Sequence, residues 1–203
     1  MQKPTTSVRQ RFPMSAALVL VVGLIAIAAL ISFSFVHIFY PTTSINNTGQ
    51  AKELVDQYLS KLSPDFRVKE IMEFSNHFYI VVQEKSTGIN AFELLLDRNT
   101  GTILYEPGPN MMWNTKYGHM GQMRETAASM SINAREASEY AQRCLDRNVP
   151  SANVEEPETF YGYYTIDLSK NGQILGMLSV NGYTGEVWYH TWHGQFIEMI
   201  EYE

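Results

Sequence analysis

The stretch Gly172–Gly194, GQILGMLSVNGYTGEVWYHTWHG, has the pattern of two β-strands joined by a tight turn. Its flanking runs are rich in β-branched, aromatic and large apolar residues, as in a half-buried hairpin. Asn181 opens the turn, where an Asx side chain can accept a backbone N–H two residues further on. Gly185 closes it, where a positive φ is usually needed to keep the strands in register. We therefore predict a hairpin with a positive φ at Gly185.

A weaker copy of this pattern, GINAFELLLDRNTGTILY, lies 84 positions earlier at Gly88–Tyr105. The pairs matched in this register are Gly88 with Gly172, Thr100 with Thr184, Gly101 with Gly185, and Tyr105 with Tyr189. Asp97 then takes the place of the Asx residue that opens the turn, and we predict a positive φ at Gly101 as well. Two related hairpins indicate an internal duplication.

An amphipathic helix precedes each hairpin. Residues 51–62 have apolar side chains at i, i+3, i+4, i+7, i+8 and i+11, which is one face of a helix. Asn133 and Glu136 resemble a capping box that opens a second helix, which ends near Leu145. Strand-like runs follow each helix, at 66–74, 77–84, 90–97 and 102–105 in the first case and near 153–156, 160–168, 173–180 and 186–192 in the second.

The predicted fold class is therefore α+β, with two duplicated helix-plus-antiparallel-sheet units at residues 50–106 and 133–203. A methionine-rich connector, residues 107–132, joins them. Units of about 55–60 residues bury little surface on their own, so we expect the two to pack on one another.

A helix followed by antiparallel strands that end in a V-x-G-x-T-G-x-V type of hairpin resembles the PepSY domain. Ala134–Tyr189 carries the closer match and Ala51–Tyr105 the looser one. PepSY domains occur in propeptides of thermolysin-type peptidases and as membrane-anchored extracytoplasmic modules, for which inhibitory or regulatory roles have been proposed. The resemblance implies a non-catalytic module that binds and modulates another envelope protein, such as a peptidase or a membrane complex.

Residues 1–40 are predicted to form a cytoplasmic tail and a transmembrane helix. Met14–Tyr40 contains no Asp, Glu, Lys or Arg, and about 20 apolar residues suffice to cross a bilayer. Lys3, Arg9 and Arg11 precede this run, which places the N-terminus in the cytoplasm. We expect a lipid-embedded helix at about 14–39 in the cell membrane and extracytoplasmic domains after it. A cleaved signal peptide is the alternative, although its apolar core is usually only about 7–15 residues long.

The part after residue 40 is acidic. It holds 12 of the 15 basic residues and all 21 acidic ones, a net charge of −9, which argues against nucleic acid as a partner.

The single cysteine, Cys144, excludes an intrachain disulfide, and its spacing from Ala137 and Ala141 predicts a buried position on a helix. No H-E-x-x-H, G-x-S-x-G or phosphate-binding glycine loop is present, so we do not expect an enzyme.

The connector suggests an alternative function. It contains five of the ten methionines, together with His119, and these are Met111, Met112, Met120, Met123 and Met130. Thioether sulfurs with an imidazole can bind copper, preferentially Cu(I), so an extracytoplasmic metal or small-ligand binder is the second hypothesis. Alternatively, Met111, Met112, Trp113 and Tyr117 form an apolar plug between the units.

The aromatic end of the second hairpin is the predicted partner-binding surface. Alternation along a strand over 186–192 places Trp188, His190 and Trp192 on one face and Val187 and Tyr189 on the other. Val187 and Tyr189 match Ile103 and Tyr105 of the first copy, so we predict that Val187 and Tyr189 face the core. We therefore expect Trp188, His190 and Trp192, with Trp113 and Tyr117 of the connector, to contact a protein partner, because aromatic residues dominate interface energetics. The alternative is that the methionine-rich connector itself folds over Trp188 and Trp192.

The same alternation bears on metal binding. His190 and His193 are three residues apart, so in a continuous strand their side chains point to opposite sides. They can share a metal ion only if the strand breaks between them. We therefore predict no metal site and no cofactor at this pair.

Overall fold

The computed structural model describes residues 44–119 and 129–202, which belong to one compact unit spanning Thr43–Glu203. The transmembrane helix expected at residues 14–39 lies outside the described residues. Among those described, no helix has the length and apolar character needed to cross a membrane.

The described residues form helices α2 (Thr48–Leu62), α3 (Pro109–Met112) and α4 (Ala134–Asn148). The strands are β1 (Phe66–Phe74), β2 (His77–Glu84), β3 (Asn90–Asp97), β4 (Ile103–Tyr105), β5 (Asn153–Val154), β6 (Glu158–Phe160), β7 (Tyr163–Lys170), β8 (Gln173–Asn181), β9 (Val187–Tyr189) and β10 (Phe196–Glu201).

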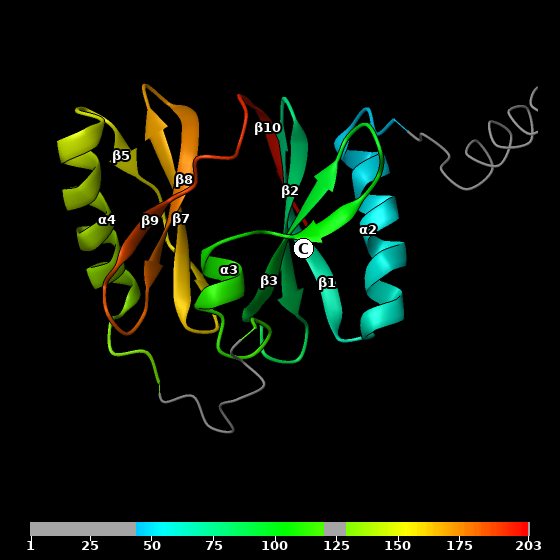
Figure 1. The fold of residues 1–203 in the computed structure, drawn as a ribbon, viewed down its shortest axis with the longest axis horizontal. Coiled ribbons are helices and arrows are strands. Elements are labelled where there is room, and N and C mark those ends of the chain that lie inside the picture. Colours follow the sequence, from blue (N-terminus) through cyan, green and yellow to red (C-terminus); the bar gives the residue numbers. More distant parts are fainter. Residues whose placement is uncertain (1–43, 120–128, 203) are drawn as a thin grey trace, which may run out of the picture. The chain divides into compact units, whose positions relative to one another are not determined.

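The fold is α+β, and its strands form one mixed sheet. Strand order is β10-β1-β2-β3-β6-β7-β8-β9, with β4 beside β3 and β5 beside β7. We expected two separate antiparallel sheets, but a parallel pairing of β3 with β6 through Asn90 and Phe160 connects them. In Figure 1, α2 covers the outer side of β1–β3 and α4 covers the outer side of β7–β9, so the two halves of the sheet lie between the helices.

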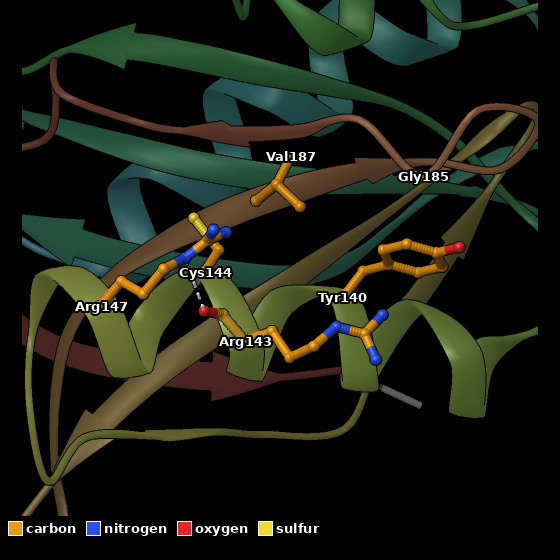
Figure 2. A pocket seen from close by; sticks show the side chains of 6 residues that line it. All are labelled: Tyr140, Arg143, Cys144, Arg147, Gly185 and Val187. Carbon is orange, nitrogen blue, oxygen red and sulfur yellow. Dashed lines mark hydrogen bonds between the residues drawn. The ribbon is translucent and has the colours of Figure 1, made fainter.

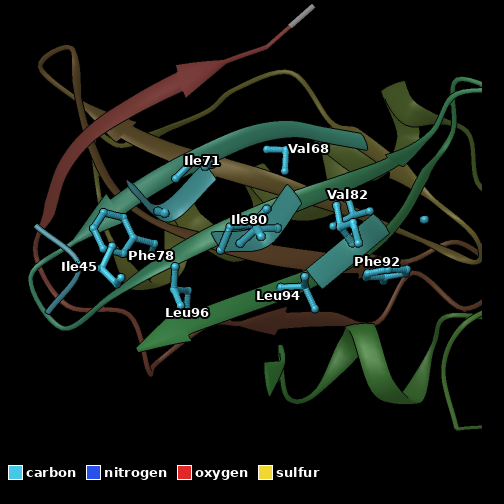
Figure 3. Close-up of a cluster of buried hydrophobic side chains, with 13 residues drawn as sticks. Ile45, Val68, Ile71, Phe78, Ile80, Val82, Phe92, Leu94 and Leu96 are labelled. Carbon is cyan, nitrogen blue, oxygen red and sulfur yellow. The ribbon is translucent and has the colours of Figure 1, made fainter. Parts of the chain in front are cut away.

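The first half is built around α2. The Asn47 side chain caps this helix by accepting a hydrogen bond from the Gln50 amide at 2.9 Å. Ala51, Val55 and Leu59 form its buried stripe and pack on the apolar face of β1–β3, as the spacing predicts. Leu62, the last residue of the predicted face, is instead 47 % exposed. Figure 3 shows side chains of this cluster, among them Ile71, Phe78, Ile80, Val82, Leu94 and Leu96.

The second half repeats this arrangement with α4. The predicted capping box is confirmed, because Asn133 accepts from the Glu136 amide and the Glu136 side chain accepts from the Asn133 amide. Ala137, Ala141 and Leu145 face β7 and β8 from this helix. We predicted that Cys144 is buried, but it is only half-buried, at the margin of the stripe.

The inner faces of the two halves pack on one another, as expected from the small size of each. Because side chains alternate along a strand, the residues that do not face a helix face the opposite half. They form a third apolar cluster, composed of Met72, Phe74, Tyr79, Val81, Phe160, Tyr163 and Met177. Polar side chains of β3, β7 and β8 share this inner layer, and the candidate site lies among them.

Both predicted turns are confirmed. Gly101 has φ 68° and Gly185 has φ 72°. Asp97 Oδ1 accepts hydrogen bonds from the amides of Asn99 and Thr100, and Asn181 plays the same role in the second hairpin. The Asx residue and the glycine thus act as the sequence pattern indicates.

The prediction of a last strand over 186–192 is wrong for the residues after Tyr189. β9 ends at Tyr189, after which the chain crosses to the turn between β1 and β2 and continues as β10 beside β1. The Asn76 side chain holds this crossing by donating to the Trp192 carbonyl at 3.1 Å and accepting from the Gly194 amide at 3.0 Å. Tyr189, predicted to face the core, is 43 % exposed. We call residues 190–195 the crossing segment.

A pair of glycine substitutions tests the second turn. Gly172 and Gly185 both have a positive φ, but an added Cβ meets nothing within 4 Å at Gly172 and lies 3.0 Å from the Tyr140 ring at Gly185. We expect Gly172→Ala to lower the free energy of unfolding by about 1 kcal/mol through backbone strain alone. Gly185→Ala should lower it by about 2 kcal/mol or more, measured by urea denaturation. Equal losses would show that the contact with Tyr140 carries no cost.

Candidate metal centre

Three ligand-type side chains from distant parts of the sequence meet in the inner layer. Glu106 follows β4, whereas His190 and His193 both lie in the crossing segment that follows β9. Glu106 Oε1 is 3.4 Å from His190 Nδ1 and 3.1 Å from His193 Nε2. One ligand atom from each of the three residues lies within 4.8 Å of the others, and among the described residues they are the only group of this kind.

The cluster is sealed from solvent, and three of its polar atoms make no well-aligned hydrogen bond. The side chains of Glu106 and His190 are 0 % exposed and that of His193 is 2 % exposed. His190 Nδ1, His193 Nε2 and Glu106 Oε2 have no hydrogen-bond partner within the described part of the chain. Buried polar atoms without partners are costly, by about 1–3 kcal/mol each, and call for an explanation such as an ion.

A hydrogen-bond chain reaches His190 from the Glu93 carboxyl. Glu93 Oε1 lies 2.6 Å from the Thr165 hydroxyl, which lies 3.1 Å from the Ser179 hydroxyl. The Ser179 hydroxyl in turn lies 2.9 Å from His190 Nε2. When His190 donates to Ser179 through Nε2–H, its Nδ1 atom, which faces Glu106, is free to bind a metal ion.

His193 is oriented by a second imidazole. His193 Nδ1 lies 2.8 Å from His77 Nε2 on β2, and its ring stacks on Phe74 with centroids 4.6 Å apart. Burial and the neighbouring His193 lower the pKa of His77 to about 4. Burial likewise lowers the pKa of His193. With both rings neutral, a hydrogen on His193 Nδ1 leaves Nε2 free as a ligand atom.

Glu106 is ionised. Burial opposes this, but the imidazoles of His190 and His193 outweigh the burial and hold the pKa of Glu106 well below its usual value. Its Oε1 also accepts a hydrogen bond from Trp192 Nε1 at 3.1 Å, and the Trp192 ring stacks on His190 with centroids 4.6 Å apart. Metal binding requires an ionised carboxylate, and the lowered pKa of Glu106 meets this condition.

A second buried carboxyl, Glu93, lies nearby and has the opposite tendency. It accepts hydrogen bonds from Tyr79, Tyr163 and Thr165, but burial and the charge of Glu106 raise its pKa well above the usual value. Two carboxyls close together in a buried layer do not both ionise readily. The layer therefore concentrates its negative charge on Glu106, the group that faces the histidines.

The ligand spacing fits a transition metal. Ligand atoms bound at about 2.0–2.1 Å around one tetrahedral ion lie about 3.4 Å apart. The observed separations of 3.1 and 3.4 Å match this value. Two imidazoles and a carboxylate suit Zn²⁺ and Fe²⁺, and Ser179 and His77 would hold the ligand rings in place.

Our sequence-based expectation that His190 and His193 lie on opposite sides is thus wrong. Strand alternation does not apply to them, because β9 ends before His190. Glu106 was not identified from the sequence, although the 84-residue register pairs it with His190. The structure repeats this equivalence, since the Glu106 amide donates to the Glu93 carbonyl and the His190 amide to the Met177 carbonyl, both at 3.0 Å.

The predicted partner-binding residues divide into three groups. His190 is 2 % exposed and belongs to the metal-type cluster rather than to a surface. Trp188 and Trp192 are half-buried and pack over Gly108, and Trp113 contacts Trp188 edge-on with centroids 6.1 Å apart. Tyr117 lies apart from them, against Phe92 of the first core.

Tyr117 is held by a charged network. Its hydroxyl donates to Glu84 Oε1, which also accepts from Lys116 at 2.5 Å, while Tyr161 donates to Oε2 at 2.5 Å. Burial opposes the ionisation of Glu84, but these hydrogen bonds and one from Thr87 lower its pKa to about 2. The Tyr117 hydroxyl therefore helps to stabilise the fold.

The methionine-rich connector is described only in part. Met111 and His119 line a surface pocket, Met112 is 55 % exposed, and Trp113 packs on the inner cluster. The plug interpretation thus applies to Trp113 and not to Met112. Met120 and Met123 lie outside the described residues.

A further pocket lies on the outer side of the second half. Figure 2 shows Tyr140, Arg143, Cys144 and Arg147 of α4 lining it together with Gly185 and Val187. Arg143 lies over the Tyr140 ring at 4.7 Å, and Arg147 donates to the Arg143 carbonyl. Both arginines thus interact with other residues of α4.

The chain matches no family model, and neither a curated protein nor a solved structure matches it.

The Glu84 network predicts a pH-dependent stability. Because the pKa of Glu84 is about 2 in the folded state and ordinarily 4.5, Glu84 stabilises the fold above about pH 4.5 and loses this effect as the pH falls toward 2. Glu84→Gln should therefore lower the free energy of unfolding by about 1–3 kcal/mol at pH 7. The difference from wild type should shrink below pH 4 in urea titrations. A difference independent of pH would contradict the ionic role.

Proposed function

We propose that this protein is a divalent-metal-binding module that holds one transition-metal ion at Glu106, His190 and His193. One observation carries the proposal: His190 Nδ1 and His193 Nε2 both face the buried Glu106 carboxylate, at 3.4 and 3.1 Å from Oε1, and neither nitrogen nor Glu106 Oε2 has a hydrogen-bond partner in the described chain. Ligand atoms around one ion lie at similar separations. An ion between them would satisfy all three at once. Zn²⁺ and Fe²⁺ fit the nitrogen and oxygen ligands better than Cu(I), which prefers sulfur.

The role of the ion is binding and not catalysis. Three protein ligands leave a further coordination position, as in catalytic zinc sites. Here, however, the ligand side chains are at most 2 % exposed and Trp192 stacks against His190. A substrate would need an open approach to the ion. We infer that the ion stabilises the contact between the two halves, because Glu106 comes from one half and the histidines come after the other.

The test is metal analysis of the purified full-length chain. Wild type stripped with chelator and titrated with Zn²⁺ or Co²⁺ should bind about one ion per chain, and Co²⁺ should give the visible absorption of a low-symmetry site. His190→Ala, His193→Ala and Glu106→Gln should each weaken binding at least about tenfold. Mass spectrometry of the bound metal and the Co²⁺ spectrum provide the readouts.

His119→Ala is the matched control, because His119 is an exposed imidazole outside the cluster. It should bind metal as wild type does. Ser179→Ala removes only the group that orients His190 and should weaken binding less than loss of the ligand. If the wild type binds no ion, or if His119→Ala has the same effect as His190→Ala, the proposed function is wrong.

A second candidate function follows from the aromatic surface. We propose that the module is anchored in the cell membrane by residues 14–39, carries tandem PepSY-like units outside the cytoplasm, and binds and modulates another envelope protein. Support comes from Trp188 and Trp192, which remain half-buried on the surface next to Trp113. Indole rings of this kind release much free energy when a partner covers them. Because no family model matches, the PepSY resemblance rests on the helix and hairpin patterns alone.

Trp188→Ala tests this surface, with Leu104→Ala as the matched control. Leu104 occupies the equivalent position in the first half and is 61 % exposed. We expect Trp188→Ala to lose a defined partner captured by crosslinking in native membranes, while its circular dichroism and its metal content match wild type. An unfolded variant would place the ring in the core. Equal partner yields from both variants would locate the partner surface elsewhere.

A further inference from the structure

An acidic groove lies between the two halves, separate from the metal-type cluster. Its volume is about 660 Å³, and its walls come from β1 and β2 on one side and from β6 and β7 on the other. Six carboxylates line it, namely Glu70, Glu155, Glu156, Glu158, Asp167 and Glu201. Lys69 is the only basic residue among its described lining, and it is already paired with Glu158.

Glu70 distinguishes this groove from an ordinary acidic surface. It is 5 % exposed and lines the groove, yet it makes no hydrogen bond or ion pair with any residue that the structure describes. In the β1–β10 pairing it lies directly across from Glu201, another acid. A buried carboxyl surrounded by acids is unfavourable in its ionised form, and it is stabilised either by a proton or by a cation that pairs with it.

The groove is not arranged for a single metal ion. Among the described residues, only Glu106, His190 and His193 bring three ligand atoms within 4.8 Å of one another, so the groove carboxylates do not close around one ion. A volume of about 660 Å³ suits an extended organic cation instead. Carboxylates spaced along the walls can pair with several positive charges along such a chain.

We propose that the groove binds an alkylammonium cation, either a free polyamine or a lysine-rich peptide segment, with Glu70 and Asp167 as its main anionic contacts. The aliphatic part of such a ligand can lie along Val81, Ile174 and Met199, which also line the groove. The proposal does not depend on the metal centre.

The titration of the groove supports this chemistry. Burial and the neighbouring Asp167, Glu158 and Glu201 raise the pKa of Glu70 to about 8, although Lys69 opposes them. Burial, Glu158 and Glu155 raise the pKa of Asp167 to about 7. Below these values both carboxyls are protonated and offer a cation little attraction. The affinity should therefore rise as the pH increases from 6 to 9, and binding should release protons.

The experiment is calorimetric titration of the full-length chain with spermidine, with a tetralysine peptide and with CaCl₂, at pH 6 and pH 8.5. We expect spermidine, the peptide or both to bind at pH 8.5 and to bind at least about tenfold more weakly at pH 6. Glu70→Gln should weaken this binding at least about tenfold at pH 8.5. Whichever amine binds more tightly identifies the source of the cation.

Glu53→Gln is the control, because it removes the same charge from an exposed position on α2. It should leave amine binding unchanged. If neither amine binds, if CaCl₂ binds in their place, or if Glu53→Gln weakens binding as much as Glu70→Gln does, the proposal is overturned. Circular dichroism of Glu70→Gln checks its fold, and Asp167→Asn provides a second variant with the same expected loss.

Discussion

The inner layer of this fold depends on burying two carboxyls, Glu93 and Glu106, both at 0 % exposure. A carboxyl removed from water needs partners, and the partners of each come from both halves or from the crossing segment. Tyr79 of the first half and Tyr163 of the second donate to the same Glu93 side chain. Sliding one half past the other would leave these groups without partners, so polar contacts determine how two otherwise apolar faces align.

The crossing segment brings the two histidines of the candidate site to Glu106 in this inner layer. It leaves β9 early, contacts the β1–β2 turn through Asn76, and carries His193 to a place beside His77. An added Cβ at Gly194 would lie 2.2 Å from the Ser75 hydroxyl and 2.7 Å from Asn76 Oδ1, so it would displace the side chains that hold this path. A few backbone contacts far from the ligands thus decide which imidazole nitrogens meet Glu106.

Local patterns in the sequence predicted the local structure well. The Asx-to-glycine turns, the capping box at Asn133 and the apolar stripes of both helices each depend on residues within a few positions of one another. The cluster could not be found in this way, because Glu106 and His190 are 84 positions apart and the chain between them carries no periodic signal that places one beside the other. Alternation along the last strand failed for a related reason. It assumes a regular partner strand, whereas β9 pairs with β8 only from Leu178 to Val180.

The pairing of β10 with β1 has a consequence for how the chain acquires its structure. Phe74 and Phe196 lie side by side although 122 positions separate them, so the first strand gains its outer neighbour only after nearly all the described chain has been synthesised. Contacts so distant in sequence slow folding, because a long loop must close before they form. During translation, the edge of β1 stays open to unwanted strand pairing until β10 arrives.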